Sequence, residues 1–108
     1  MLGPVMIENA FALVLQINLT DKPFEHRRVW VEATGPFGYK ESNWYTWTDI
    51  NTSDKSATVT MNLPDSEFPS NSELKVCVSS NDLLAFVAPN CRMFENSGGS
   101  QSVTISLR

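Results

Sequence analysis

The chain has 108 residues, 42% of them hydrophobic and 19% charged, which suits one domain with its own core and is too short for two. Its formal net charge is −4 and its Lys and Arg residues are scattered, which argues against the basic surface that binds nucleic acid or anionic membranes. The longest unbroken apolar runs, at 10–15 and 83–89, are far shorter than the ~20 residues of a transmembrane helix. We therefore expect one domain, no transmembrane segment and no nucleic-acid partner.

The first twelve residues have some features of an export signal. Ala10-Phe11-Ala12 has the small-x-small form of a signal-peptidase site, and an apolar stretch without Lys or Arg precedes it. Residues 13–20 then alternate as a first β-strand would. The sequence predicts the remnant of a signal peptide at 1–12 and a domain at 13–108, and hence a secreted or extracytoplasmic protein. In the alternative, Ala10-Phe11-Ala12 merely begins the first strand and the protein is cytoplasmic.

Apolar and polar residues alternate through most of the chain, a period that places them on opposite faces of β-strands. Turn-forming segments such as TGPFGYK and NSGGS separate the alternating runs, and no stretch has the 3.6-residue period of a helix. The predicted strands are 13–20, 27–34, 42–49, 56–63, 73–79, 84–88 or 91–95, and 101–107. Seven short strands in about 100 residues indicate an antiparallel β-sandwich, with a small β-barrel as the alternative.

Aromatic residues are concentrated in the segment FGYKESNWYTWTD, residues 37–49. On a strand, Trp44 and Thr46 share one face while Tyr45 and Trp47 share the other. One face must pack in the core, so the other exposes at least one large aromatic side chain, with Trp30 expected beside it on the neighbouring strand. Exposed aromatics of this kind anchor protein partners or stack on sugar rings. The alternative is cross-strand packing that only stabilises the sheet.

The following segment, DINTSD at 49–54, begins like a calcium-binding loop. However, Asp54 stands where such a loop needs Gly, and Thr60 stands where the closing Glu belongs. A turn held by Asn and Asp side chains explains the segment without an ion. The single His26 lies in the charged stretch FEHRR, and the sequence contains no nucleophile elbow, phosphate loop or zinc-peptidase motif. We therefore expect no enzyme activity, no cofactor and no metal.

The segment ATVTMNLPDSEFPSNSELKVCVSS, residues 57–80, resembles part of a fibronectin type III or related immunoglobulin-like domain. Leu63-Pro64 would close one strand, and Leu74-x-Val76-x-Val78 would open the next. The resemblance covers about a fifth of the chain, and Leu74 stands where the family usually has Tyr. It implies an immunoglobulin-like sandwich and no particular ligand, because this fold hosts many functions.

The two cysteines, Cys77 and Cys91, are predicted to form a disulfide, since two Cys in a small exported domain usually pair. Closing a 15-residue loop stabilises the folded state by about 3 kcal/mol. In the alternative both thiols stay free and pack as small hydrophobes. The apolar run 83–88 lies between them. It is either a buried strand or a loop tied at its base, in which case Leu84 and Phe86 form an exposed patch.

These observations predict a non-catalytic extracytoplasmic or cell-surface module that acts through protein–protein contacts. The alternatives are a carbohydrate-binding module that uses exposed aromatics, and a subunit of a larger surface assembly that adds the strand 13–19 to a neighbouring sheet. The candidate binding residues are Trp30, Tyr39, Trp44, Leu84 and Phe86. Asn18-Leu19-Thr20 and Asn51-Thr52-Ser53 match the acceptor pattern for N-glycosylation, which has meaning only if the protein is exported.

Overall fold

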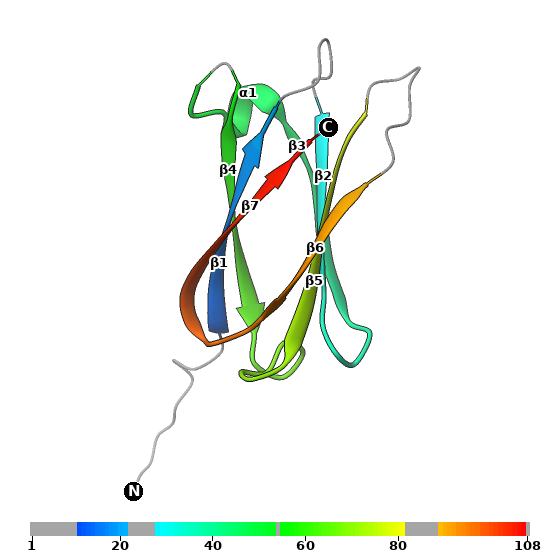
Figure 1. The fold of residues 1–108 in the computed structure, drawn as a ribbon, viewed down its shortest axis with the longest axis vertical. Helices are drawn as coiled ribbons and strands as arrows, with labels where there is room; N and C mark the ends of the chain where they lie inside the picture. The colour runs from blue at the N-terminus through cyan, green and yellow to red at the C-terminus, as the bar shows by residue number, and fades with distance from the viewer. Residues whose placement is uncertain (1–10, 22–27, 54, 82–88, 108) are drawn as a thin grey trace, which may run out of the picture.

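The computed structural model describes residues 11–21, 28–53, 55–81 and 89–107, and these form two β-sheets packed face to face (Figure 1). The three-stranded sheet has the order β4 (Ala57–Pro64), β1 (Phe11–Thr20), β7 (Gly99–Ser106). The four-stranded sheet has the order β3 (Lys40–Thr46), β2 (Arg28–Thr34), β5 (Glu73–Asn81), β6 (Asn90–Glu95). The predicted all-β sandwich of seven strands is therefore confirmed. The barrel alternative is wrong, since no strand of one sheet joins the other among the described residues.

Strand β1 lies at the centre of the three-stranded sheet and is paired on both sides. It runs antiparallel to β4 and parallel to β7, with Leu13 aligned to Gly99 and Thr20 aligned to Ser106. All pairs in the four-stranded sheet are antiparallel. The chain crosses from one sheet to the other after β1, β3, β4 and β6, and Figure 1 shows the last of these crossings, the turn between β6 and β7, at one end of the sandwich. The parallel β1–β7 pair was not anticipated from the sequence.

The core lies between the sheets and follows the alternation of the sequence. Each strand turns one apolar set inward because successive side chains point to opposite faces. The three-stranded sheet contributes the buried residues Leu13, Leu15, Ile17, Leu19, Ala57, Val59, Met61, Leu63, Val103 and Ile105. The four-stranded sheet contributes Val29, Val31, Ala33, Leu74, Val76 and Val78. Trp47 precedes β4 and Phe68 follows it, so these two large buried side chains close opposite ends of the core.

The predicted strand at 42–49 is too long at its C-terminal end. The strand ends at Thr46, and a single helical turn, α1 (Trp47–Ile50), follows it. The Thr46 hydroxyl donates to the Asp49 carboxylate, and the Asn51 amide closes the turn on the Trp47 carbonyl at 2.9 Å. This turn carries Trp47 into the core, where its side chain is only 5% exposed.

The remaining strand boundaries agree with the sequence to within a few residues. Of the two alternatives for the sixth strand, the structure has β6 at Asn90–Glu95, while 84–88 lies outside the described residues. Strand β1 begins at Phe11, inside the predicted signal remnant. Residues 1–10 lie outside the described part of the chain, so cleavage of a signal stays a prediction.

Cys77 and Cys91 form the predicted disulfide. They are directly opposite each other in the antiparallel β5–β6 pair, with Cα atoms 4.0 Å apart. Cys77 is out of phase with Val76 and Val78, so the bridge lies on the outer face of the four-stranded sheet. It ties the edge strand β6 to the strand beside it.

Candidate functional site

The outer face of the four-stranded sheet, here called the aromatic face, brings together two of the predicted aromatic residues. Trp30 of β2 and Trp44 of β3 are cross-strand neighbours, as expected. Trp30 is half-buried, whereas Trp44 is 44% exposed. Tyr45 points the opposite way and packs against the core. The alternation of β3 therefore exposes Trp44 and leaves Tyr45 on the inner side.

The exposed tryptophan is covered in part by an arginine that the sequence alone did not single out. The Arg28 guanidinium carbon lies 4.8 Å from the centre of the Trp44 ring, within cation–π range. Arg28 pairs with Thr46, one row along from the Trp30–Trp44 row, so the contact is diagonal across the two strands. One face of the indole ring is therefore occupied by a cation.

Charges surround the tryptophans on the aromatic face. Besides Arg28, Lys40 of β3 lies 3.8 Å from the Glu32 carboxylate of β2, and Lys75 of β5 is exposed opposite Met93 of β6. The Met93 side chain is 53% exposed. The basic groups of this face, Arg28, Lys40 and Lys75, are matched in number by the acidic groups Glu32, Glu73 and Glu95. At one end of the β5–β6 pair, Glu73 faces Glu95.

The other predicted binding residues lie elsewhere. Tyr39 is 52% exposed near the tip of the β2–β3 hairpin, next to an exposed Phe37. A bond from the Gly38 amide to the Gly35 carbonyl forms that tip, and Gly38 has φ +88°, as a turn that leads back into the sheet requires. Leu84 and Phe86 fall at 82–88, outside the described residues. The structure therefore brings together Trp30 and Trp44, and not Tyr39.

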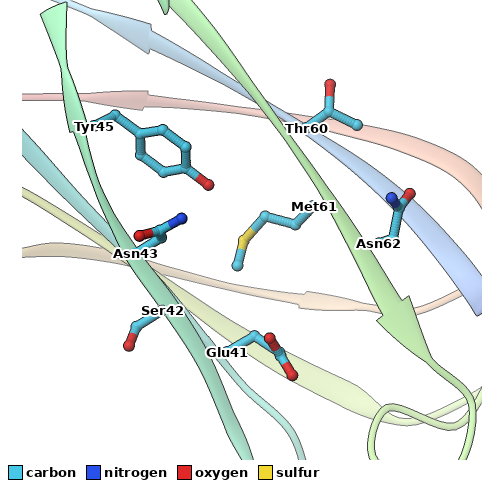
Figure 2. Close-up of a pocket in the computed structure, with 7 residues that line it drawn as sticks. All are labelled: Glu41, Ser42, Asn43, Tyr45, Thr60, Met61 and Asn62. Carbon is cyan, nitrogen blue, oxygen red and sulfur yellow. The ribbon is translucent and has the colours of Figure 1, made fainter.

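A hollow, here called the side groove, opens between strands β3 and β4, with a volume of about 240 Å³. Figure 2 shows Tyr45, Asn43 and Glu41 of β3 and Met61 of β4 in the space between the two strands. The remaining lining residues are Ser42, Thr60 and Asn62. This groove was not predicted from the sequence.

The side groove exists because β3 presents polar residues where an inner strand presents apolar ones. Glu41 and Asn43 are exposed although they have the same phase as the half-buried Tyr45. Met61 is nearly buried and forms the apolar part of the lining. The signal in the sequence is the alternation Glu41, Asn43, Tyr45, whose polar members do not suit a sheet interior. The result is a hollow of amide, hydroxyl and carboxylate groups beside one aromatic ring.

The segment that begins like a calcium loop forms a turn in the structure. The Ser53 hydroxyl accepts bonds from the amides of Lys55 and Ser56, at 3.3 and 3.2 Å. The Asn51 amide, with its nitrogen toward the helix, donates to the carbonyls of Thr48 and Trp47. Asp54 and His26 lie outside the described residues. Across 11–21, 28–53, 55–81 and 89–107, no three His, Cys, Asp or Glu side chains are grouped so as to hold a metal ion.

Comparisons with known proteins place no relative beside this chain. No protein-family model, no curated protein and no solved structure matches it. Of the helices in the described part of the chain, none has both the length and the apolar character needed to cross a membrane. The class that the described residues define is a seven-stranded β-sandwich with one disulfide.

Proposed function

We propose that this protein is a non-catalytic binding module that holds a protein partner on its aromatic face. The observation that carries the proposal is Trp44, a large aromatic exposed on a rigid sheet with the Arg28 guanidinium against its ring. Tryptophan and arginine are enriched among the few residues that dominate protein–protein affinity. Here they are adjacent and lie on a strand pair rather than on a loop, so little conformational entropy is lost when they are buried.

The charges of the aromatic face define the partner that fits it. Arg28 lies against Trp44, Lys75 lies opposite Met93 and Lys40 is paired with Glu32, while Glu73 and Glu95 face each other at one end. A partner surface with apolar groups and with acidic groups opposite Arg28 and Lys75 is complementary to this arrangement. Charges at the rim of an interface act mainly on the association rate. Because salt screens exposed charges, binding should weaken as the salt concentration rises.

The proposed setting is the cell exterior or another extracytoplasmic space. The Cys77–Cys91 disulfide supports it, since disulfides persist in oxidising compartments and are rare in the cytosol. The proposed relationship to immunoglobulin-like domains is supported by the sandwich architecture and by β4 and β5, which end and begin where the resemblance expected. The parallel β1–β7 pair departs from the antiparallel sheets of that class.

The test is saturable binding of the labelled protein to the surface of cells from its source organism. Unlabelled wild-type protein should displace the label. Trp44→Ala should bind about 30-fold more weakly, because loss of a hot-spot residue costs ~2 kcal/mol of binding free energy. Gln16→Ala, on the outer face of the other sheet, is the control and should compete like the wild type. Binding that is not saturable, or that Trp44→Ala displaces as well as wild type does, would contradict the proposal.

The side groove favours a second candidate, a small carbohydrate ligand. The Glu41 and Asn43 side chains beside the Tyr45 ring supply the hydrogen-bonding groups and the aromatic surface that sugars need. The groove suits a sugar better than Trp44 does, because Arg28 already occupies one face of the Trp44 ring. Titration with soluble oligosaccharides, followed by amide NMR, should shift the signals of these residues. Tyr45→Phe should keep that response and Asn43→Ala should reduce it, whereas shifts confined to the aromatic face would exclude the groove.

A third possibility, assembly by strand addition, requires a different strand from the one that the sequence suggested. Strand β1 has β4 on one side and β7 on the other, so its backbone edges are already paired. On the β6–β7 side, Asn90 and Arg92 donate to the carbonyls of Ser106 and Thr104. Those contacts protect the outer edge of β7 from a further strand. Assembly would then use the opposite edges, at β3 or β4.

A further inference from the structure

The outer face of the three-stranded sheet, here called the polar face, has an unusual composition. Its side chains come from alternate positions of three strands and align in rows. They are Val14, Gln16, Asn18 and Thr20 of β1, Thr58, Thr60 and Asn62 of β4, and Ser100, Ser102, Thr104 and Ser106 of β7. None is charged, although charged residues are 19% of the chain. Nearly all are hydroxyl or amide groups, which suits contact with a neutral, hydroxyl-rich ligand.

We propose that Asn18, in the middle of this face, carries an N-linked glycan whose first sugars lie over the polar face. Asn18 belongs to the acceptor sequence Asn18-Leu19-Thr20. Its row contains Thr58 on one side and Thr104 on the other, so short hydroxyl side chains flank it. Leu19 points inward and is fully buried, which fixes Asn18 outward by the alternation of the strand.

The Asn18 amide is oriented so that its nitrogen, the atom to which the glycan would be attached, is not used in a hydrogen bond within the described residues. The Thr58 hydroxyl donates to Asn18 Oδ1 at 3.3 Å. Within the described residues no protein group accepts a hydrogen bond from Nδ2. In the transfer, Nδ2 forms a bond to C1 of the first sugar of a lipid-linked oligosaccharide. The C1–oxygen bond to the lipid diphosphate breaks, and the amide gives up one proton. The Thr58–Oδ1 bond persists, because the carbonyl oxygen takes no part.

The second acceptor sequence, at Asn51, differs in its surroundings. The Asn51 amide nitrogen donates to the Thr48 and Trp47 carbonyls at 3.0 and 3.1 Å and so closes the end of α1. A glycan on that nitrogen would remove one of these two bonds. The structure therefore assigns the glycan to Asn18, where no such bond is lost.

A glycan at Asn18 has a consequence for the orientation of the molecule. It would cover the polar face and leave the aromatic face, on the opposite side of the sandwich, open to a partner. The inference shares with the proposed function only the export of the chain. It does not depend on which partner binds, because occupancy of Asn18 is measured without one.

The experiment is secretion of the chain from a eukaryotic cell, followed by enzymatic deglycosylation in water containing heavy oxygen. Deglycosylation converts a glycosylated Asn into heavy-oxygen-labelled Asp, which peptide mass spectrometry locates. We expect the label at Asn18 in most secreted molecules that contain the Cys77–Cys91 disulfide. Thr20→Ala should abolish it, and Thr20→Ser, the matched control, should retain it. An unlabelled Asn18 in the secreted, oxidised protein would overturn the inference.

Occupancy of Asn18 in molecules that the cell retains is a different outcome from occupancy in secreted molecules. If Asn18 is occupied only in molecules that the cell retains, the glycan is incompatible with this fold and the inference fails. If Thr20→Ala is not secreted, Asn18→Gln provides the glycan-free protein instead. The cell-binding comparison of wild type and Trp44→Ala, made with glycan-free protein, separates failure of the glycan site from failure of the proposed function.

Discussion

The amide nitrogen of Asn96, which is fully buried, donates a hydrogen bond to the carbonyl of Phe68 at 2.9 Å. The same nitrogen lies 3.2 Å from the Pro69 carbonyl, and Asn96 Oδ1 accepts from the Gly98 amide at 2.7 Å. The backbone of Asn96 also bonds to Asn71 and Ser72. This one side chain joins the β4–β5 loop to the turn between β6 and β7.

Replacement of Asn96 by Ala should therefore destabilise the fold by about 2–4 kcal/mol, because buried backbone groups lose their partners. Chemical denaturation of wild type and Asn96→Ala measures the difference. Ser97→Ala, at the neighbouring exposed position, is the control and should change stability by less than ~0.5 kcal/mol. An equal stability for wild type and Asn96→Ala would contradict the role assigned to this bond network.

Asn96→Asp provides a pH test of the same network. The introduced carboxylate would be buried and face two carbonyl oxygens, so its pKa in the folded state should lie above its unfolded value of ~3.9. The destabilisation of Asn96→Asp relative to wild type should be fully present at pH values above the raised pKa that this carboxyl has in the folded state. It should shrink as pH falls toward the unfolded value, since a protonated carboxyl can donate to the Phe68 carbonyl. Unfolding curves at neutral and acidic pH, each relative to wild type, check the sign.

Gly35 is expected to tolerate no side chain. A Cβ atom there would lie 2.4 Å from the Glu67 carbonyl oxygen and 3.1 Å from the Phe68 ring. Gly35→Ala should cost about 1–3 kcal/mol and displace the loop that holds Phe68. Gly38→Ala is the comparison, since Gly38 has φ +88° but open space around it. Amide NMR should show shifts at Phe68 for Gly35→Ala only, and shifts there in both variants would contradict the packing.

Replacement of Trp44 and replacement of Trp47 by Ala should have very different effects on stability. Trp47→Ala removes a buried end of the core and should cost about 3–5 kcal/mol. Trp44→Ala removes an exposed ring and should cost less than ~1 kcal/mol, part of it from the contact with Arg28. Denaturation midpoints test the costs. A soluble quencher should reduce the fluorescence of Trp47→Ala, which retains Trp44, more strongly than that of Trp44→Ala.

Reduction of the disulfide should leave a folded but weaker protein. Cys77 and Cys91 are 14 positions apart, and a closed loop of this length contributes about 3 kcal/mol through the entropy of the unfolded chain. The double variant Cys77→Ala/Cys91→Ala should lose a similar amount, and reductant should not change its stability. A reductant-dependent change in that variant would point to an effect other than the disulfide.

The sequence was sufficient for the sandwich because the alternation of apolar residues is a local property of each strand. It predicted the face of Trp44 for the same reason, whereas the pairing of the cysteines was predicted from their number in a small domain expected to be exported. It placed Trp47 on a strand, because one helical turn leaves no periodic pattern. It did not predict the roles of Phe68 and Asn96, whose partners lie far away in the chain.

The candidate sites divide in the same way. Trp30 and Trp44 could be placed together from strand phase and the short turn between their strands. The Arg28 contact could not, since it depends on how a long side chain lies across that strand pair, and the side groove could not, since β3 and β4 belong to different sheets. The order of strands in each sheet, and the parallel alignment of β7 with β1, follow from how the whole core is filled. No segment of the chain contains that information by itself.

The β1–β7 pair has a further consequence for how the protein is made. Strand β1 emerges first from the ribosome, yet one of its two neighbours is β7, aligned from Gly99 to Ser106. Contacts between segments so distant in sequence form slowly, because the loop between them must be closed first. Until β7 is synthesised, one edge of an apolar strand lacks its partner, and an uncovered edge invites pairing with other chains. The nascent chain therefore keeps this unpaired edge until after both disulfide-forming cysteines have been synthesised.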